Sequence, residues 1–180
     1  MNDLVILVNE QDQEIGTMPK LEAHQKGLLH RAFSVFIFNT QGELLLQQRA
    51  FDKYHSAGLW SNTCCSHPYI DENILTAANR RLHEEMGIAT DLQEIHSFIY
   101  HEALDNDLIE HEFDHVLIGM TDEMPKINTH EVADFQYISL ENLQIDMELN
   151  PEKYTVWFKI CLTSVAEKFR SSNYFKNIVS

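Results

Sequence analysis

Apolar residues recur along the chain in two spacings, which together predict an interleaved series of strands and helices. Compact apolar runs and two-residue alternation are typical of strands. The segments with these patterns are residues 4–9, 32–38, 43–48, 93–102, 109–120 and 135–138. Asn39-Thr40-Gln41-Gly42 separates two of them and is typical of a hairpin turn. Residues 59–67 are expected to be short and partly extended.

Other segments have helical spacing or none. Apolar side chains recur every three or four positions in residues 71–86, and Gly87 is a natural stop for a helix there. Residues 20–29 are polar and form either a helix or a loop. Residues 52–58 are expected to form a polar loop.

The clearest helical stripe lies near the C-terminus. Asn150 is placed to cap a helix, and Pro151 suits its first turn. The stripe consists of Tyr154, Trp157, Phe158, Cys161, Leu162, Val165 and Phe169. Strands and helices interleave without a regular strand–helix–strand rhythm. We therefore predict an α/β fold, a mixed sheet sandwiched by helices.

The bulk composition suits one folded domain and excludes several classes of partner. The 180 residues are 44% hydrophobic and 23% charged, so a single domain over residues 1–180 is expected. The net charge of -15 argues against nucleic acid and against an anionic membrane surface. No apolar run approaches the ~20 residues that span a bilayer. A small anionic ligand remains possible where cations and metals cluster locally.

The N-terminus and the cysteines indicate a reducing compartment. Met1-Asn2-Asp3 is acidic rather than basic, so no secretory signal is expected. Cys64 and Cys65 are adjacent, which makes a poor structural bridge, and Cys161 leaves an odd number. We therefore predict a cytoplasmic protein.

The predicted helix over residues 71–86 carries arginines and glutamates at regular spacing. Its charged residues include Arg80, Arg81, Glu84 and Glu85, which would form solvent-facing pairs four residues apart. Alternatively, carboxylates on one face of the helix hold magnesium against a diphosphate, because this ion prefers oxygen ligands, water and phosphate. Taken alone, the helix favours neither interpretation.

The segment Ser61-Asn62-Thr63-Cys64-Cys65-Ser66-His67-Pro68 leads into this helix. In an extended backbone Cys65 and His67 project to one side and Cys64 to the other. A thiol beside a metal-bound imidazole would have a lowered pKa and would serve as a proton carrier. The competing interpretation is that Cys65 is a small buried hydrophobic residue. Cys64 is expected only to pack.

Two carboxylates share one face of the strand predicted over residues 109–120. Glu110 and Glu112 flank His111, and like charges held that close require a cation or a shared proton. An isolated pair of this kind is more simply a solvent-facing strand edge. Tyr100 lies upstream and is either an active-site residue or a core aromatic.

In this order, the segments resemble the type I isopentenyl-diphosphate isomerases of the Nudix superfamily. The isomerases share the run N-[ST]-x-C-x-H-P, then a degenerate Nudix helix, a tyrosine and an E-x-E pair. The resemblance extends over residues 4–169 and implies a Nudix-type α/β/α sandwich with a mixed sheet. The Nudix pattern G-x5-E-x7-R-E-U-x-E-E-x-G-U, with U aliphatic, corresponds to Ser66, Glu72, Arg80, Arg81, Leu82, Glu84, Glu85, Gly87 and Ile88. Ser66 replaces its first glycine and Arg81 replaces a glutamate.

The resemblance also implies two metal sites. Imidazole with carboxylate suits zinc, manganese or iron and is compatible with Mg²⁺. Glu85 would hold a separate Mg²⁺ with the diphosphate. The ligands of the first site would be His24, His30, His67, Glu110 and Glu112. The other histidines are expected to be surface or packing residues: His55, His83, His96, His101, His111, His115 and His130.

The implied activity interconverts isopentenyl and dimethylallyl diphosphate in isoprenoid biosynthesis. A proton is added on one face of the substrate and another is removed on the opposite face. Cys65 and Glu112 would be the acid–base pair, with Tyr100 close to Glu112. Trp157 either shields developing positive charge by a cation–π contact or simply packs. The diphosphate would be bound by Lys20, Arg49, Lys53 and Arg81.

Two other functions share parts of this pattern. A Nudix hydrolase of a small diphosphate compound would use the same helix, but it needs no Cys65 and favours glutamate at position 81. A non-catalytic metal-binding or interaction domain would retain the fold without turnover.

Overall fold

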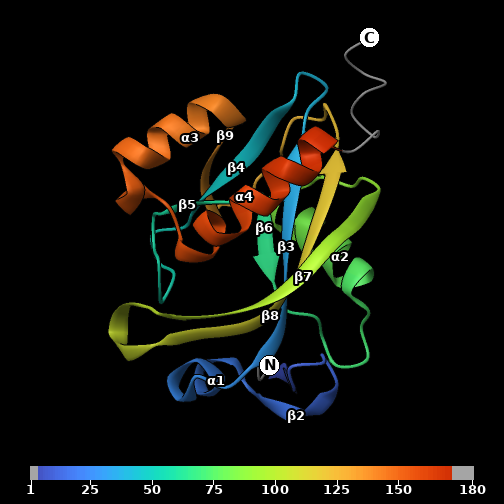
Figure 1. The fold of residues 1–180 in the computed structure, drawn as a ribbon, viewed down its shortest axis with the longest axis vertical. Helices are drawn as coiled ribbons and strands as arrows, with labels where there is room; N and C mark the ends of the chain where they lie inside the picture. Colours follow the sequence, from blue (N-terminus) through green and yellow to red (C-terminus); the bar gives the residue numbers. More distant parts are fainter. Residues whose placement is uncertain (1–3, 172–180) are drawn as a thin grey trace.

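The computed structural model describes residues 4–171, in which one nine-stranded mixed sheet carries helices on both faces (Figure 1). The strands are β1 Leu4–Val8, β2 Glu14–Pro19, β3 His30–Phe38, β4 Glu43–Arg49, β5 Trp60–Ser61, β6 Cys64–Ser66, β7 Leu92–Ala103, β8 Ile109–Met120 and β9 Val132–Ser139. The helices are α1 Lys20–Lys26, α2 Ile74–Met86, α3 Leu140–Leu149 and α4 Val156–Ser171. Short 3₁₀ turns cover Asp105–Asp107 and Pro151–Lys153.

Strand β3 is the centre of the sheet. It pairs in parallel with β8 and antiparallel with β1, β4 and β6. Strand β7 adds to the far side of β8, and β9 adds to β4. The parallel register sets His30 beside Glu112, and the β7–β8 register sets Tyr100 on the other side of Glu112. Three predicted site residues therefore lie side by side on neighbouring strands.

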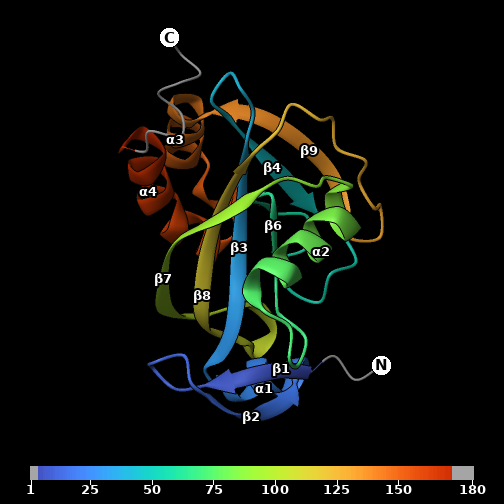
Figure 2. The same ribbon diagram turned by 90° about the vertical axis from the view of Figure 1, so that its right-hand side faces the viewer.

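Alternate residues of β3 face two separate hydrophobic cores, because successive strand side chains point to opposite faces. Phe36 and Phe38 pack in the core beneath α4. Phe33, Val35 and Ile37 pack in the core beneath α2. Figure 2 shows α2 on one side of the sheet and α3 and α4 on the other. The predicted α/β/α sandwich with a mixed sheet is confirmed.

Most elements agree with the pattern of apolar residues, within a few residues at their ends. Residues 20–29 form α1 followed by a turn. Helix α2 starts later than expected because the side chain of Asn73 caps it, accepting a hydrogen bond from Thr76 N. Gly87 ends α2, as predicted, and it does so in the left-handed conformation that glycine adopts readily.

The predicted start of the C-terminal helix is wrong. Asn150 and Pro151 begin a single 3₁₀ turn, and Tyr154 is extended and pairs with Trp60. Helix α4 begins at Val156, although most of the predicted stripe is buried as expected. Helix α3 was not predicted; within it only Leu143 is fully buried, so its apolar pattern is weak.

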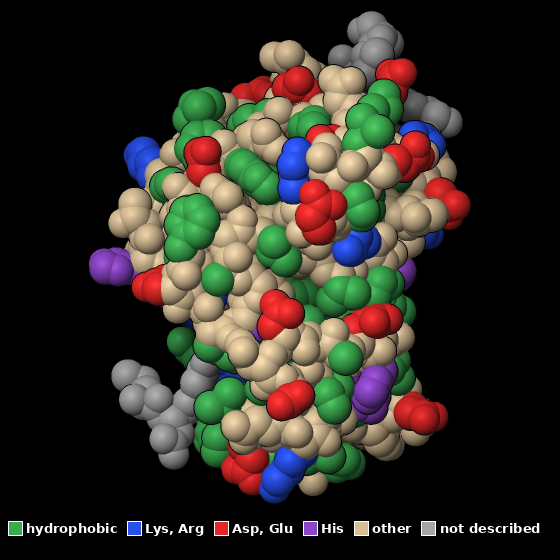
Figure 3. Space-filling model, turned by 90° about the vertical axis from the view of Figure 1, so that its left-hand side faces the viewer, with side chains coloured by type: hydrophobic (Ala, Val, Ile, Leu, Met, Phe, Trp, Pro, Cys, Tyr) green, Lys and Arg blue, Asp and Glu red, His purple; other side chains and the backbone are tan. Residues whose placement is uncertain are grey.

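The described surface mixes hydrophobic and charged side chains. On the face in Figure 3, acidic side chains are scattered among fewer basic ones, which agrees with the net charge of -15. Within residues 4–171, none of the helices is long and apolar enough to cross a membrane.

Candidate active site and metal centre

One pocket brings the predicted site residues together from across the chain. Every predicted catalytic, substrate-binding and metal-binding residue lines it except His30. His30 is fully buried behind the pocket wall, and its Nε2 lies 3.5 Å from Glu112 Oε1. Residues separated by more than one hundred positions, such as Lys20 and Trp157, therefore share one site.

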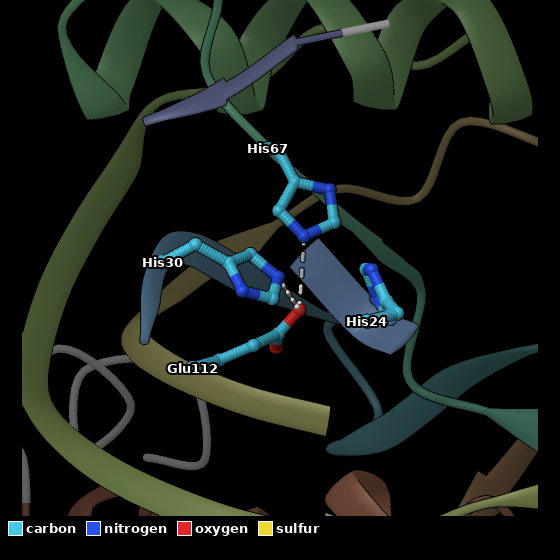
Figure 4. Close-up of side chains that lie close together, drawn as sticks. All are labelled: His24, His30, His67 and Glu112. Atoms are coloured by element: carbon cyan, nitrogen blue, oxygen red, sulfur yellow. Dashed lines mark hydrogen bonds and ion pairs between the residues drawn. The ribbon is translucent and has the colours of Figure 1, made fainter. Parts of the chain in front are cut away.

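Three histidines converge on the carboxylate of Glu112 (Figure 4). His67 follows β6, and its Nε2 lies 2.9 Å from Glu112 Oε1. His30 approaches from β3 and His24 from α1, so that one ligand atom of each residue lies within 4.8 Å of the others. Glu110 adds a carboxylate nearby, with its Oε2 3.2 Å from His24 Nε2.

The hydrogen bonds of the histidines leave their Nε2 atoms available. His24 Nδ1 donates to the carbonyl of Lys20 at 2.7 Å, and His30 Nδ1 donates to the carbonyl of Leu28 at 2.8 Å. A carbonyl can only accept, so both rings carry a proton on Nδ1, and in the neutral form each has its lone pair on Nε2.

Buried polar atoms without partners support a metal at this place. Within the described residues, His24 Nε2, His30 Nε2 and Glu110 Oε2 are buried and have no hydrogen-bond partner. Such groups are costly unless something compensates them. Nitrogen and carboxylate donors facing a common centre are the set that divalent metals bind. The residues present therefore fit a divalent ion.

The two carboxylates differ in their tendency to ionise. Burial and the charge of Glu112 raise the pKa of Glu110. Burial also opposes ionisation of Glu112, but its interactions with His30 and His67 outweigh this and hold its pKa well below the usual range. Burial lowers the pKa of His67 to about 3, so that its ring is neutral. Neutral imidazole and carboxylate are the forms that bind metals.

Glu112 is held by a tyrosine on the side away from the histidines. The Tyr100 hydroxyl donates to Glu112 Oε2 at 2.6 Å, and burial raises the pKa of this hydroxyl well above its usual value. Both oxygens of Glu112 are therefore engaged, one by His67 and the other by Tyr100.

Cys65 and Cys64 occupy opposite faces of β6, as their alternation predicted. Cys64 is fully buried in the core beneath α2, while Cys65 is partly exposed and lines the pocket. The expected lowering presupposes a metal on the neighbouring imidazole and stays a prediction, whereas burial acts in the opposite direction on the Cys65 pKa. Burial raises it to about 12, and the charge of Arg49 only partly opposes this. The thiol is therefore protonated at neutral pH.

The predicted diphosphate-binding residues line the same pocket as Cys65 and Glu112. Arg49 donates to the carbonyls of His55 and Ser56 at 3.2 Å each, and its guanidinium lies 5.2 Å from the centre of the Trp157 ring. The Trp157 indole in turn donates to Ser61 Oγ at 3.0 Å. Arg49 and Trp157 thus form one rigid wall.

Arg81 joins the pocket to the carboxylates of α2. Its Nη2 lies 2.5 Å from Glu85 Oε1 and 3.5 Å from Glu131 Oε1, and its Nη1 lies 2.8 Å from Glu84 Oε2. Glu85 is buried and also accepts from Gln47 Nε2 at 3.0 Å. The expected Arg81–Glu85 pair is present, but it is buried at the pocket rather than solvated.

Among the pocket residues that sequence reasoning missed, Glu131 and His55 contact the predicted site residues most directly. Glu131 precedes β9 and forms an ion pair with Lys53 as well as with Arg81. His55 lies in the polar loop after β4 and was expected to be a surface or packing residue. It is buried, and its Nε2 lies 3.8 Å from Glu110 Oε1. Burial, aided by Arg49, lowers the pKa of His55 to about 2. A loop of polar residues gave no signal for either contact.

The sequence matches the model of one domain family and is similar to several proteins that share one enzyme name. The sequence model of the NUDIX domain family matches residues 28–158. An isopentenyl-diphosphate Delta-isomerase of Serratia proteamaculans is 52% identical over 158 residues, covering 88% of each chain. A protein of the same name from Aliivibrio fischeri is 46% identical over 181 residues, covering 96% of this chain and all of its own.

Structural comparisons add the fold alone, because identities are low. The crystal structure of DR0079 from Deinococcus radiodurans has a TM-score of 0.71 at 18% identity and covers 93% of this chain and 97% of its own. The MutT protein of Methanosarcina mazei Go1 has a TM-score of 0.62 at 19% identity, with 79% of this chain and 93% of its own covered.

Proposed function

The chain belongs to the isopentenyl-diphosphate Delta-isomerases within the Nudix family, and on this basis we propose that it interconverts isopentenyl and dimethylallyl diphosphate at the pocket of Cys65 and Glu112. The observation that carries the proposal is the meeting of three groups of side chains in this one pocket. A thiol, a tyrosine-bound carboxylate and a set of cations line it together.

The substrate's diphosphate would bind at the basic end of the pocket. Lys20, Arg49 and Lys53 offer cations there, and Arg81 adds a planar guanidinium suited to phosphate oxygens. Glu85 lies beside Arg81 and would hold Mg²⁺ against the diphosphate, because this ion prefers carboxylate, water and phosphate oxygens. This end of the pocket positions the substrate and takes no part in proton transfer.

The hydrocarbon part would lie between the acid–base pair. Moving the double bond requires one proton to be added to the alkene and another to be removed from the opposite face of the substrate. Cys65 and Glu112 would exchange these protons with the substrate. The Tyr100 hydroxyl, which donates a hydrogen bond to Glu112 Oε2, would hold this carboxylate in place and relay its proton. Trp157, fixed by Ser61 and Arg49, would present its ring to developing positive charge.

The metal centre would belong to the Glu112 side of the pocket. His24, His30 and His67 with the two glutamates would hold a divalent ion, for which Zn²⁺, Mn²⁺ and Mg²⁺ are all candidates. Such an ion supplies positive charge that orders the carboxylates and tunes their acidity. The imidazoles themselves would fix the orientation of Glu112 toward the substrate.

The hydrolase alternative is weaker because of the side chain at position 81. A hydrolysing Nudix helix uses a glutamate there to hold metal, whereas Arg81 neutralises Glu85. A site with fewer carboxylates free for metal is better suited to binding a diphosphate than to cleaving it.

The proposal is tested by comparing the two adjacent cysteines. We expect Cys65→Ala to abolish isomerisation of isopentenyl diphosphate, because the thiol that exchanges a proton with substrate is removed. Cys64→Ala should retain most of the activity, since Cys64 lies in the core. Its cost should be on the order of 1 kcal/mol of stability from the lost buried sulfur. Product formation and thermal unfolding measure the two effects. Equal loss of activity in two folded variants would refute the assignment.

A further inference from the structure

His55 is a buried histidine for which the proposed reaction has no role. It belongs to the loop between β4 and β5, and only 6% of it is exposed. Its ring is stacked at 5.9 Å on the ring of His24 and lies edge-on at 5.9 Å to that of Trp157. The loop therefore places a further imidazole between the metal-binding cluster and the wall of the substrate pocket.

The carboxylate of Glu110 lies between His55 and His24. Its Oε2 is 3.2 Å from His24 Nε2, and its Oε1 is 3.8 Å from His55 Nε2. One ligand atom from each of the three residues lies within 4.8 Å of the others. Two ligands bound at ~2.0–2.2 Å to one ion are at most about 4.4 Å apart. The separations around Glu110 are thus close to those of ligands on a common ion.

Unpaired buried atoms point independently to a ligand at this place. His24 Nε2 and Glu110 Oε2 are both without a hydrogen-bond partner, and both residues are more than nine-tenths buried. His55 Nδ1 faces Ser56 Oγ at 3.4 Å, which leaves Nε2 as the atom directed at Glu110. The group of His24, His55 and Glu110 shares His24 with the group of His30, His67 and Glu112.

We propose that His55 is an additional nitrogen ligand of the metal centre. Its ion would be shared with His24 and Glu110, because one ligand atom of each of these three residues lies within 4.8 Å of the others. This inference rests on the metal centre of the proposed function. A further imidazole favours first-row ions such as Co²⁺ and Zn²⁺ over Mg²⁺, which prefers oxygen ligands. His55 thereby sets the metal preference of the site.

Cobalt binding without substrate tests the role of His55, because Co²⁺ absorption in the visible range depends on the ligands. The full chain is stripped with a chelator and titrated with Co²⁺. We expect His55→Gln to weaken Co²⁺ binding at least about tenfold, the size of effect known for outer partners of metal ligands, and to shift the spectrum. The control is His83→Gln, at an exposed position on α2, which should change neither.

A second variant tests the same contact through the appearance of a new absorption band. His55→Cys should add near-ultraviolet absorption from thiolate-to-cobalt charge transfer, and His83→Cys should not. The inference would be overturned if His55→Gln bound Co²⁺ with the affinity and spectrum of the wild-type chain and His55→Cys showed no new absorption. The metal centre of the proposed function would then still stand. If the wild-type chain bound no Co²⁺, the metal centre itself would fall, and this inference with it.

Discussion

At the scale of single residues, Arg81 most clearly separates isomerase from hydrolase. It stands where the Nudix pattern has a glutamate, and it contacts three carboxylates: those of Glu84, Glu85 and Glu131. Burial alone would lower the pKa of its guanidinium, but the charge of Glu85 and its other partners raise it. Arg81 therefore remains a cation at the basic end of the pocket.

Replacing Arg81 should weaken substrate binding more than turnover. A lost charge-assisted contact is worth roughly 1.5–3 kcal/mol, or about ten- to a hundredfold in affinity. We expect Arg81→Ala to raise KM by this amount, because a cation for the diphosphate is lost and Glu85 loses its counter-ion. The value of kcat should fall less, since the diphosphate is bound alike in ground and transition states. Arg81→Glu should be worse without creating a good hydrolase.

Arg80 provides the matched control for this substitution. It is the preceding residue on α2, but it pairs with Glu72 through two hydrogen bonds of 2.8 Å and stacks on Tyr69 outside the pocket. Arg80→Ala should therefore leave KM nearly unchanged. If Arg81→Ala did the same in steady-state kinetics, Arg81 would have no part in holding the diphosphate.

At the scale of elements, α2 depends on how it ends. Gly87 has a φ of 66°, and a Cβ there would lie 2.8 Å from Lys126 Cβ and 2.9 Å from Lys126 O. Gly42 has a φ of 79°, but a Cβ there would meet only Phe169 at 3.6 Å. Alanine at either position carries the left-handed penalty of about 1–2 kcal/mol.

Gly87→Ala should thus be more destabilising than Gly42→Ala. Both share the backbone strain, and Gly87→Ala must also displace the backbone of Lys126. Urea unfolding of the two variants measures the difference. Since α2 carries Arg81 and Glu85, Gly87→Ala should raise KM as well. Equal losses of stability would mean that the segment of Lys126 yields at no cost.

Elements with strong local patterns were predicted well from sequence. The buried run of β3 and the capped, amphipathic α2 carry their signals within a few neighbouring residues. The start of α4 was misjudged because Asn150-Pro151 is an equally good signal for a single 3₁₀ turn. Only the pairing of Tyr154 with Trp60, distant in sequence, decides between the two.

The site was predictable in part, and the missing parts have a physical reason. Resemblance led to His67 and Glu112, whose motifs are compact. Glu131 reaches Lys53 only because β9 pairs with β4, which joins Glu131 O to Ala50 N. His55 is buried by α1 and α4, which are remote in sequence. Periodicity within a segment contains no information about such contacts.

At the scale of the whole molecule, the charge is unevenly distributed. The chain carries -15 overall but has only 13 basic residues, of which Lys20, Arg49, Lys53 and Arg81 line one pocket. The overall field repels anions, so a diphosphate is attracted only where these cations are concentrated. The sheet order that sets β3 beside β8 places Glu112, to which we assign proton transfer, in the same pocket as these cations.

Conversion of isopentenyl diphosphate is the most direct test of the central claim. The purified wild-type chain is incubated with this substrate, Mg²⁺ and Mn²⁺, and the products are followed by NMR. We predict that dimethylallyl diphosphate forms and that a chelator stops the reaction, because the proposed mechanism needs the metals assigned to Glu85 and to the histidine centre. Release of inorganic phosphate from isopentenyl or nucleoside diphosphates, without any dimethylallyl diphosphate, would contradict the account and favour a Nudix hydrolase.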